Sequence, residues 1–237
     1  MQKFQAALLR KIPLTHDVFQ FDFSLEGQSI DFKAGQFFML ELNDEKGRAT
    51  RSYSVSSAPS NKDFFSLCVK LLPDGRGSKR LRELSEGEMA SFMAPFGHFF
   101  IPDAGMVEGS KDIVLIATGT GLAPFMSILP DLFERHFSGQ IQLYFGVRHE
   151  EDLFYVDELR AWEAEHPHFT AHISLSQAPE AWEGLRGRVT DHLQLLDAAS
   201  SQVYICGNGD MVKSVKTMMD EKGVPKDSLH WEQFTAL

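Results

Sequence analysis

Residues 113–124 read IVLIATGTGLAP, and this stretch decides the fold class of the C-terminal half of the chain. The apolar run predicts a buried strand, Gly119 to Gly121 a turn, and Ala123-Pro124 the start of a helix. Small residues after a strand let a ligand approach the backbone, and a helix N-terminus offers unpaired N–H groups to a phosphate. Because glycine turns after strands are common, the stretch alone is not specific for nucleotides.

The stretch differs from two familiar phosphate-binding motifs. Pro124 stands where the dinucleotide fingerprint has its third glycine, and the next predicted strand is followed by Arg148 where that fingerprint has a carboxylate for the ribose. No Gly-Lys-Ser/Thr follows the turn, so the stretch is not a Walker loop either.

Around this stretch, strands and helices alternate from about residue 110 to the end. Such alternation predicts a five-stranded parallel sheet covered by helices, an α/β domain. The predicted strands are 113–117, 141–147, 169–175, 203–206 and 229–233, and the predicted helices are 123–136, 153–165, 189–196 and 210–221.

The N-terminal half has a different pattern. Residues 18–23 (VFQFDF) alternate with period two, as a half-buried strand does. Further strands are predicted at 36–42, 51–56, 64–71 and 88–93, with one short helix at 78–84. About six antiparallel strands in a hundred residues indicate a small six-stranded β-barrel. We therefore expect two domains, residues 1–106 and 107–237, joined through the glycine-containing segment 102–111.

Charge divides along the same line. The 237 residues include 23 Lys and Arg against 33 Asp and Glu, a formal net charge of −10. Residues 1–106 contain 13 basic and 13 acidic side chains, whereas residues 107–237 contain 10 and 20. A general nucleic-acid binder needs a basic face that replaces phosphate counterions, so the composition argues against that class.

Cysteine, histidine and hydropathy exclude other classes. Two cysteines, Cys68 and Cys206, cannot form a disulfide framework, a four-cysteine zinc site or a cysteine-ligated iron–sulfur cluster. The His166-Pro167-His168 segment lacks metal-ligand spacing, so no metal site is expected. The uncharged stretch 113–130 is broken by glycines and prolines, and residues 1–13 have no signal-peptide core. We expect a cytoplasmic protein without membrane insertion.

Two further features of the N-terminal half have a structural and a functional interpretation. Period two places Arg51 and Tyr53 on one face of a strand, and Ser52 and Ser54 on the other. Such a strand is either an exposed strand with a core tyrosine or a clamp for a phosphate and a flat ring. A basic cluster follows, which is either a solvated helix face or a contact for a ligand phosphate or an acidic partner protein. Its members are Arg76, Lys79, Arg80 and Arg82.

Combined, the motifs closely resemble the ferredoxin–NADP⁺ reductase superfamily over nearly the whole chain. Three carry most of the resemblance: Arg51-x-Tyr53-Ser54, Gly75-x-x-Ser78 and the GTGLAPF segment at 119–125. The further matches, in the order of the family, are LCVK at 67–70, PFG at 95–97, YFGVR at 144–148, CGN at 206–208 with Met211, and Glu232-x-Phe234. The resemblance implies a flavin-binding β-barrel followed by a nicotinamide-binding α/β domain.

The resemblance also implies the flavin-binding residues. Arg51 would pair with the flavin phosphates through its fork of donors, and Tyr53 would lie against the isoalloxazine and the ribityl chain. Ser54 would donate a hydrogen bond near flavin N5. Gly75, Gly77 and Ser78 would donate hydrogen bonds to the pyrophosphate. Thr120 would border the flavin from the second domain. The rest of the implied FAD set is Ser52, Val69 and Arg76.

On the nicotinamide side, the resemblance implies that Cys206 faces the nicotinamide, although it is equally compatible with a small buried hydrophobic residue. Glu232 and Phe234 would approach the flavin from the side opposite Tyr53, with Ser54, Cys206 and Glu232 forming the catalytic set. The chain continues with residues 235–237, so it stays open whether Phe234 shields the flavin or the tail extends toward the adenine. The remaining residues of the implied coenzyme site are Gly119, Gly121, Gly207, Asn208 and Met211.

The choice between NADH and NADPH depends on cations near the 2′-phosphate. Arg148 and Arg188 match two of three arginines found in NADPH-using relatives, but Gln177 stands near the place of the other. Acidic residues surround them, and a doubly negative group would be unfavourable there. These are Glu150, Glu151, Asp152, Glu180 and Glu183. The sequence favours NADH and leaves NADPH open.

The sequence therefore predicts an FAD-dependent NAD(P)H oxidoreductase. Its expected acceptor is a separate redox protein (ferredoxin, flavodoxin or an oxygenase component), because the chain has no cysteines for a cluster of its own. Two alternatives stay open: a reductase of free flavin or small molecules, and an electron-transfer subunit that acts only inside a larger complex.

Overall fold

The computed structural model describes residues 2–103, 111–194, 196 and 198–234. Contacts between residues divide it into two units. Of the described residues, those up to Ile101 and those of Ala123–Glu134 form the antiparallel unit, and those within 102–122 and 135–234 form the parallel unit. The expected domain boundary between residues 106 and 107 lies outside the described residues.

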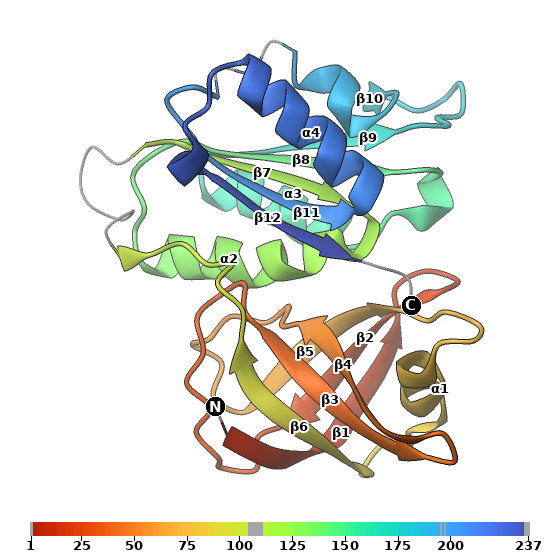
Figure 1. Cartoon of the computed structure of the whole chain (residues 1–237). Helices are drawn as coiled ribbons and strands as arrows, with labels where there is room; N and C mark the ends of the chain where they lie inside the picture. Colours follow the sequence, from red (N-terminus) through yellow and green to blue (C-terminus); the bar gives the residue numbers. More distant parts are fainter. Residues whose placement is uncertain (1, 104–110, 195, 197, 235–237) are drawn as a thin grey trace. The chain divides into compact units, whose positions relative to one another are not determined.

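The antiparallel unit is built on one curled six-stranded sheet with the order β4-β3-β6-β1-β2-β5 (Figure 1). An isolated bridge between Val55 and Leu67 links the end of β4 to β5, the strand at the opposite edge. The six-stranded antiparallel prediction is confirmed. The strands are β1 (Gln2–Pro13), β2 (Val18–Ser24), β3 (Phe37–Asp44), β4 (Gly47–Ser54), β5 (Phe64–Lys70) and β6 (Met89–Phe96).

Strand β1 was not among the strands located from the sequence, although it is the longest of the sheet. Its first half buries Phe4, Ala6 and Leu8, and the pairing with β2 shifts between Leu8 and Arg10. A β-bulge interrupts the two-residue period of a strand, so the apolar alternation of this segment is short.

Phenylalanine rings fill the core of the antiparallel unit. The rings of Phe4, Phe23, Phe38, Phe65 and Phe92 contact one another with centroid separations of 4.9 to 5.9 Å. Close-packed aromatic rings hold each strand in one register, because a slip by one residue would turn these rings toward solvent. The core therefore fixes the outward-facing residues of β4.

Helix α2 (Ala123–Glu134) packs with the antiparallel unit, although it follows the first parallel strand in the chain. The Ser127 hydroxyl donates to the Ser57 carbonyl at 2.6 Å, and the Phe125 ring lies 5.8 Å from that of Phe99. The antiparallel unit is therefore discontinuous in the sequence.

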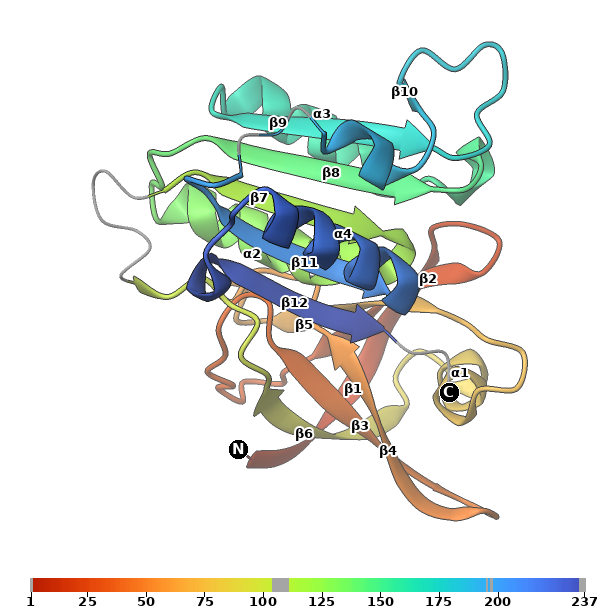
Figure 2. The ribbon, with the colours of Figure 1, turned by 45° about the horizontal axis from the view of Figure 1, so that its top comes forward.

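The parallel unit has a six-stranded sheet with the order β10-β9-β8-β7-β11-β12 (Figure 2). Five strands agree with the prediction, and the sixth, β10, is a two-residue edge strand that the sequence did not indicate. The strands are β7 (Ile113–Thr118), β8 (Ile141–Val147), β9 (Phe169–Leu175), β10 (Leu185–Arg186), β11 (Gln202–Asn208) and β12 (Leu229–Phe234).

Helices cover both faces of this sheet. On one face, the 3₁₀ helix η4 (Val189–His192) and α4 (Gly209–Glu221) pack on the apolar residues of β7 and β11. On the other, Phe154, just before α3 (Val156–Glu165), packs its ring 5.5 Å from Phe145. The helix predicted over 189–196 is wrong in length: η4 has 3₁₀ hydrogen bonds, with Asp191 N–H donating to the Arg188 carbonyl.

The order of the strands reverses between β7 and β11, because successive connections run outward on either side of these two strands. In open α/β sheets, ligands bind outside the carboxyl ends of the strands at such a switch point. Among the described residues, no helix is long and apolar enough to cross a membrane.

Candidate functional site

A first candidate site lies in the antiparallel unit, where β4 meets helix α1 (Arg76–Glu83). A Cβ atom on Gly77 would stand 2.2 Å from the Tyr53 hydroxyl and 3.0 Å from Cγ of Arg51. The side chains of Arg51 and Tyr53 therefore lie together on one face of β4, against the first turn of α1. Only glycine leaves room for this approach, and burial raises the pKa of the Tyr53 phenol to about 12.

The first turn of α1 keeps its backbone donors available. No side chain hydrogen-bonds to the cap of this helix, and its first turn contains no acidic residue. The Ser78 hydroxyl is buried and accepts from the Leu72 N–H at 3.0 Å, which holds the loop that leads into the helix. A helix N-terminus beside an arginine is a suitable site for a phosphate.

Arg76 is already engaged within the antiparallel unit. Its guanidinium forms a two-bond ion pair with Asp44 at 2.6 and 2.8 Å and also donates to the Gly47 carbonyl. The hydrogen bond from Arg76 is the main reason that the pKa of Asp44 is lowered. The structure thus gives Arg76 the role of joining α1 to the β3–β4 turn, and its expected cofactor contact stays a prediction.

The other residues predicted around the flavin differ in exposure. Ser54, the last residue of β4, is buried, whereas Ser52, two residues earlier on the same face of the strand, is exposed. Val69 is buried in the aromatic core of the antiparallel unit, so its side chain faces away from solvent. Any contact of Val69 with a ligand would therefore be through its backbone.

A second candidate site lies in the parallel unit, at the switch point of its sheet. Residues Gly119–Leu122 form a 3₁₀ turn, η2, directly after β7. A Cβ atom on Gly121 would stand 2.2 Å from the Cys206 carbonyl oxygen and 2.7 Å from Cα of Gly207. Backbone therefore touches backbone here, whereas Gly119, at φ +53°, has open space around its Cα. Thr120 lies between these two glycines and is partly exposed.

The end of β11 is equally tight. A Cβ atom on Gly207 would stand 2.3 Å from the Thr118 hydroxyl and 2.8 Å from Cε of Met211, and its φ of +153° favours glycine. The Asn208 side chain caps α4 by accepting from the Met211 N–H at 2.9 Å. The CGN segment and Met211 therefore build one strand-to-helix turn beside η2.

Cys206 and Glu232 are direct neighbours across β11 and β12. Cys206 is a free cysteine with 0% exposure, and burial, with a further contribution from the charge of Glu232, raises the pKa of its thiol. Burial also raises the pKa of Glu232 to about 7. At neutral pH the pair consists of a protonated thiol and a carboxyl group that is about half protonated.

Two arginines near the carboxyl edge of the parallel sheet have no side-chain partners among the residues that the structure describes. Arg148 directly follows β8 and Arg188 precedes η4, and both are exposed. No ion pair or side-chain hydrogen bond is formed by either guanidinium within the described ranges. Phe234 ends β12 and is half-buried, and the tail at 235–237 lies outside the described residues.

Known proteins match this chain over both of its units. Residues 5–101 match the family model of the oxidoreductase FAD-binding domain, and residues 115–217 match that of the oxidoreductase NAD-binding domain. The chain is 32% identical to ferredoxin–NADP reductase B of Sorangium cellulosum, and the alignment covers 98% of each protein. The chain belongs to the ferredoxin–NADP⁺ reductase superfamily.

Two further members of the superfamily show how far the similarity extends. The anthranilate 1,2-dioxygenase electron transfer component of Acinetobacter baylyi is 31% identical over 93% of this chain, but the chain covers only 63% of that protein. A ferredoxin NADP⁺ reductase from Neisseria gonorrhoeae, solved with bound FAD and NADP, is 26% identical with a TM-score of 0.85. Its alignment covers 98% of this chain and 99% of that one.

The residues of this chain fit both a flavin and a nicotinamide dinucleotide. In the antiparallel unit, Gly77 lets the side chains of Arg51 and Tyr53 lie against the first turn of α1, and an arginine beside uncapped helix donors suits a phosphate-bearing flavin such as FAD. In the parallel unit, Gly121 and Gly207 pack the turn after β7 against the end of β11, and Gly119 has open space at the switch point, where a nicotinamide dinucleotide can approach the backbone.

Two structural features near the candidate sites are not indicated by the sequence. The ion pair between Arg76 and Asp44 joins residues of two elements, and no local pattern indicates it. Arg186, which organises the loop after β9, was not singled out either, although the glycines on either side of it mark an irregular segment. The superfamily motifs identify ligand contacts and say nothing of such internal ones.

Proposed function

We propose that this chain is an FAD-dependent NAD(P)H oxidoreductase that passes electrons to a separate redox protein. One observation carries the proposal: each unit has a tight turn that requires glycine, and this turn lies beside residues suited to a redox cofactor. In the antiparallel unit this is Gly77 with Arg51 and Tyr53, and in the parallel unit Gly121 with Cys206. In this proposal, residues 1–106 form the FAD domain and residues 107–237 the NAD(P) domain.

The residues of the antiparallel unit bind and orient the flavin in this proposal. Arg51 and the N–H groups at the start of α1, from Arg76 to Ser78, hold its phosphates, while the Gly75 N–H donates to the Leu72 carbonyl. The Tyr53 ring packs against its flat ring system, and the raised pKa keeps this phenol neutral. Ser54 donates a hydrogen bond beside the reacting atom. When bound, FAD supplies the redox chemistry: it accepts a hydride from the nicotinamide and releases electrons singly or in pairs.

The parallel unit provides the coenzyme site in this proposal, together with two groups that can hold a proton, the Cys206 thiol and the Glu232 carboxyl. The turns at Gly119–Leu122 and Gly207 accept the dinucleotide, with Asn208 and Met211 fixing the start of α4. The Cys206 thiol holds its proton at Sγ because its pKa is raised, so it acts as a neutral neighbour of the nicotinamide and not as a nucleophile. The Glu232 carboxyl, with a pKa of about 7, can hold or release one proton near neutral pH.

The acceptor is proposed from the relatives. The chain covers between 56% and 65% of several oxygenase reductase components that it matches, and 98% of a ferredoxin–NADP reductase. The two cysteines of these 237 residues are too few to ligate a cluster within them, and a ferredoxin, flavodoxin or oxygenase component is the proposed acceptor. A cytoplasmic location belongs to the same proposal.

The coenzyme is proposed to be NADH. Arg148 and Arg188 are the exposed cations at the coenzyme edge, and Gln177 offers no charge beside them. Acidic side chains on the neighbouring turns, among them Glu180 and Glu183, are exposed and would repel a 2′-phosphate.

Heat release of the cofactor tests the proposal directly. The purified protein is expected to be yellow and to contain FAD at about one per chain, and to oxidise NADH when ferricyanide or a ferredoxin is supplied. A colourless protein that binds no added FAD would overturn the proposal, and release of FMN alone would overturn the choice of flavin.

Two substitutions separate binding from chemistry. Arg51→Ala removes a charge-assisted phosphate contact of about 1.5–3 kcal/mol, which corresponds to about 10- to 150-fold in the Kd for FAD. Ser54→Ala is expected to retain FAD but to slow its reduction by NADH in rapid mixing at saturating FAD. Unchanged reduction in Ser54→Ala would remove Ser54 from the catalytic set.

A further inference from the structure

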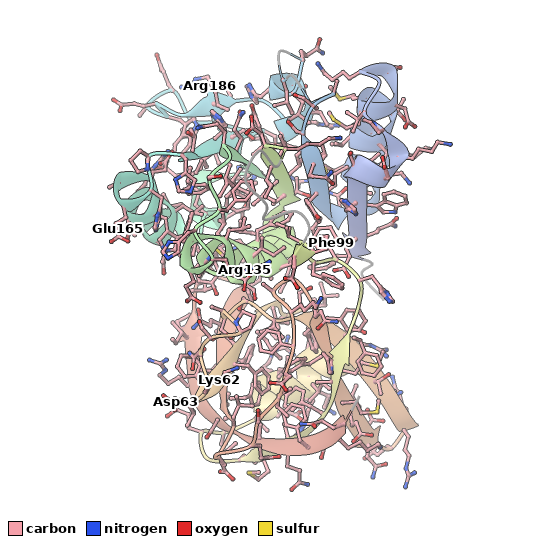
Figure 3. All side chains as sticks on the ribbon, turned by 90° about the vertical axis from the view of Figure 1, so that its left-hand side faces the viewer. Lys62, Asp63, Phe99, Arg135, Glu165 and Arg186 are labelled. Atoms are coloured by element: carbon pink, nitrogen blue, oxygen red, sulfur yellow. The ribbon has the colours of Figure 1, made fainter. Side chains whose placement is uncertain are left out.

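Arg186 makes an unusual set of contacts for an exposed arginine. Its guanidinium donates to four backbone carbonyl oxygens of the preceding loop: Ala178 at 3.4 Å, Pro179 at 2.9 Å, Glu180 at 2.7 Å and Trp182 at 2.9 Å. The side chain is labelled in Figure 3, on the segment that carries β10. Four carbonyl groups of one turn therefore converge on a single cation.

Trp182 closes the same loop from within. Its indole N–H donates to the Leu185 carbonyl at 3.0 Å, and its backbone N–H donates to the Pro179 carbonyl at 3.0 Å. A Cβ atom on Gly184 would stand 2.5 Å from the indole ring, so the ring lies directly on this glycine. We call residues 177–187 the Arg186 loop. Its shape is set by its own hydrogen bonds.

The ends of the Arg186 loop are fixed to the carboxyl edge of the parallel sheet. Gln177 N–H donates to the Arg148 carbonyl at 2.9 Å, and Gly187 N–H donates to the Leu175 carbonyl at 2.9 Å. The loop therefore stands beside the residue that follows β8. In doubly wound sheets, the end of the strand after the phosphate-binding turn meets the adenosine ribose of a dinucleotide. The Arg186 loop thus borders the adenosine end of the coenzyme site.

The contacts of Arg186 also separate it from the two arginines nearby. Arg148 and Arg188 have no side-chain partner among the described residues, so their guanidinium groups are available to a ligand. The donors of Arg186 are directed at loop carbonyls at distances of 2.7 to 3.4 Å. A lysine would retain the charge but not the planar fork of donors that reaches several carbonyls at once.

We propose that Arg186 is a positioning residue for the adenosine end of the nicotinamide coenzyme: it holds the Arg186 loop in the shape that binds the adenosine diphosphate part shared by NADH and NADPH. The inference rests on the proposed function, because that function supplies the coenzyme. Arg186 acts through the loop and touches no ligand. Its loss therefore weakens binding and leaves the reacting groups in place.

Two variants and a control distinguish this role from a direct charge contact. Arg186→Lys retains the charge and loses the fork, Arg186→Gln loses both, and Lys226→Gln removes one exposed positive charge just before β12, at the amino-end edge of the sheet. The FAD-loaded protein is used throughout. The probes are the inhibition constants of ADP and of nicotinamide mononucleotide, and KM and kcat for both coenzymes.

We expect both Arg186 variants to raise the inhibition constant of ADP and the KM for NADH and NADPH by a common factor of about three to ten. kcat and the inhibition constant of nicotinamide mononucleotide are expected to stay within about twofold. Hydrogen exchange at the Trp182 amide should also accelerate without ligand. Lys226→Gln should behave as the unsubstituted protein.

The opposite outcomes overturn the proposal in distinct ways. If Arg186→Lys retains the KM for NADPH while Arg186→Gln raises only that value, Arg186 contacts the 2′-phosphate directly. If both variants only lower the melting temperature, the loop is structural alone. If the unsubstituted protein binds ADP but oxidises neither coenzyme, the proposed function fails, and ADP affinity still decides the role of Arg186.

Discussion

The Glu232 carboxyl makes the stability of this protein depend on pH in a defined direction. Burial raises its pKa from 4.5 to about 7. The folded state therefore binds a proton more tightly than the unfolded state, and the contribution of this group is fully present below the unfolded pKa and lost as pH rises through the folded value. Replacement by glutamine removes this dependence, because an amide does not titrate in that range.

The magnitude follows from the two pKa values. A difference of 2.5 units between 4.5 and about 7 corresponds to about 3 kcal/mol over the full titration. Between about pH 5 and pH 8.5 the wild-type protein should lose about 2.5 kcal/mol of unfolding free energy that Glu232→Gln retains. The variant is thus expected to become the more stable of the two toward alkaline pH.

Urea unfolding at a series of pH values measures this difference. Glu158→Gln is the matched control, since Glu158 is exposed on α3 and should leave the pH dependence unchanged. Carbon NMR of carboxyl-labelled glutamate should show one group that titrates near neutral pH and is missing in Glu232→Gln. Parallel pH profiles for the wild type and Glu232→Gln would refute the reasoning.

The tight glycine contacts and the charge of the parallel unit give three further predictions. Gly121→Ala forces its Cβ against the Cys206 carbonyl, so it should cost about 1–3 kcal/mol of stability and abolish tight coenzyme binding. Gly119→Ala has open space and should retain coenzyme binding despite backbone strain. Calorimetric titration with NADH compares the two variants, and equal affinities would contradict the importance of the Gly121 contact. Gly77→Ala pushes against the Tyr53 hydroxyl and should yield protein that purifies with less FAD, as its absorption spectrum reports; full occupancy would show that α1 moves freely. kcat/KM should favour NADH, and a preference for NADPH above about 100-fold, about 2.7 kcal/mol, would show the coenzyme assignment to be wrong.

The sequence predicted long, regular elements well because their patterns are local. The five main parallel strands follow from apolar runs between helices, and β2 follows from its two-residue period. Strand β1 and strand β10 were not located, because a bulge interrupts the first and the second has only two residues. Neither leaves a period long enough to recognise.

The candidate site residues were predicted from the superfamily motifs and not from geometry. Those motifs name both Cys206 and Glu232, but the sequence does not show that they are direct neighbours across two strands, since register is set by packing. The same limit applies to Arg76. An arginine there suits a phosphate, but the fold pairs its guanidinium with the Asp44 carboxylate. Contacts between distant segments are decided by the fold, and their residues look ordinary in the sequence.

The discontinuous composition of the antiparallel unit has a consequence for how the chain is made. Its sheet ends at residue 96, but the Ser57 carbonyl and the Phe99 ring each contact a residue of α2. During synthesis, the N-terminal unit therefore remains incomplete until Glu134 has left the ribosome, after the first strand of the other unit has already emerged. Nascent chains halted at residue 101 should resist protease less than chains halted beyond α2, although both contain every strand of the antiparallel sheet.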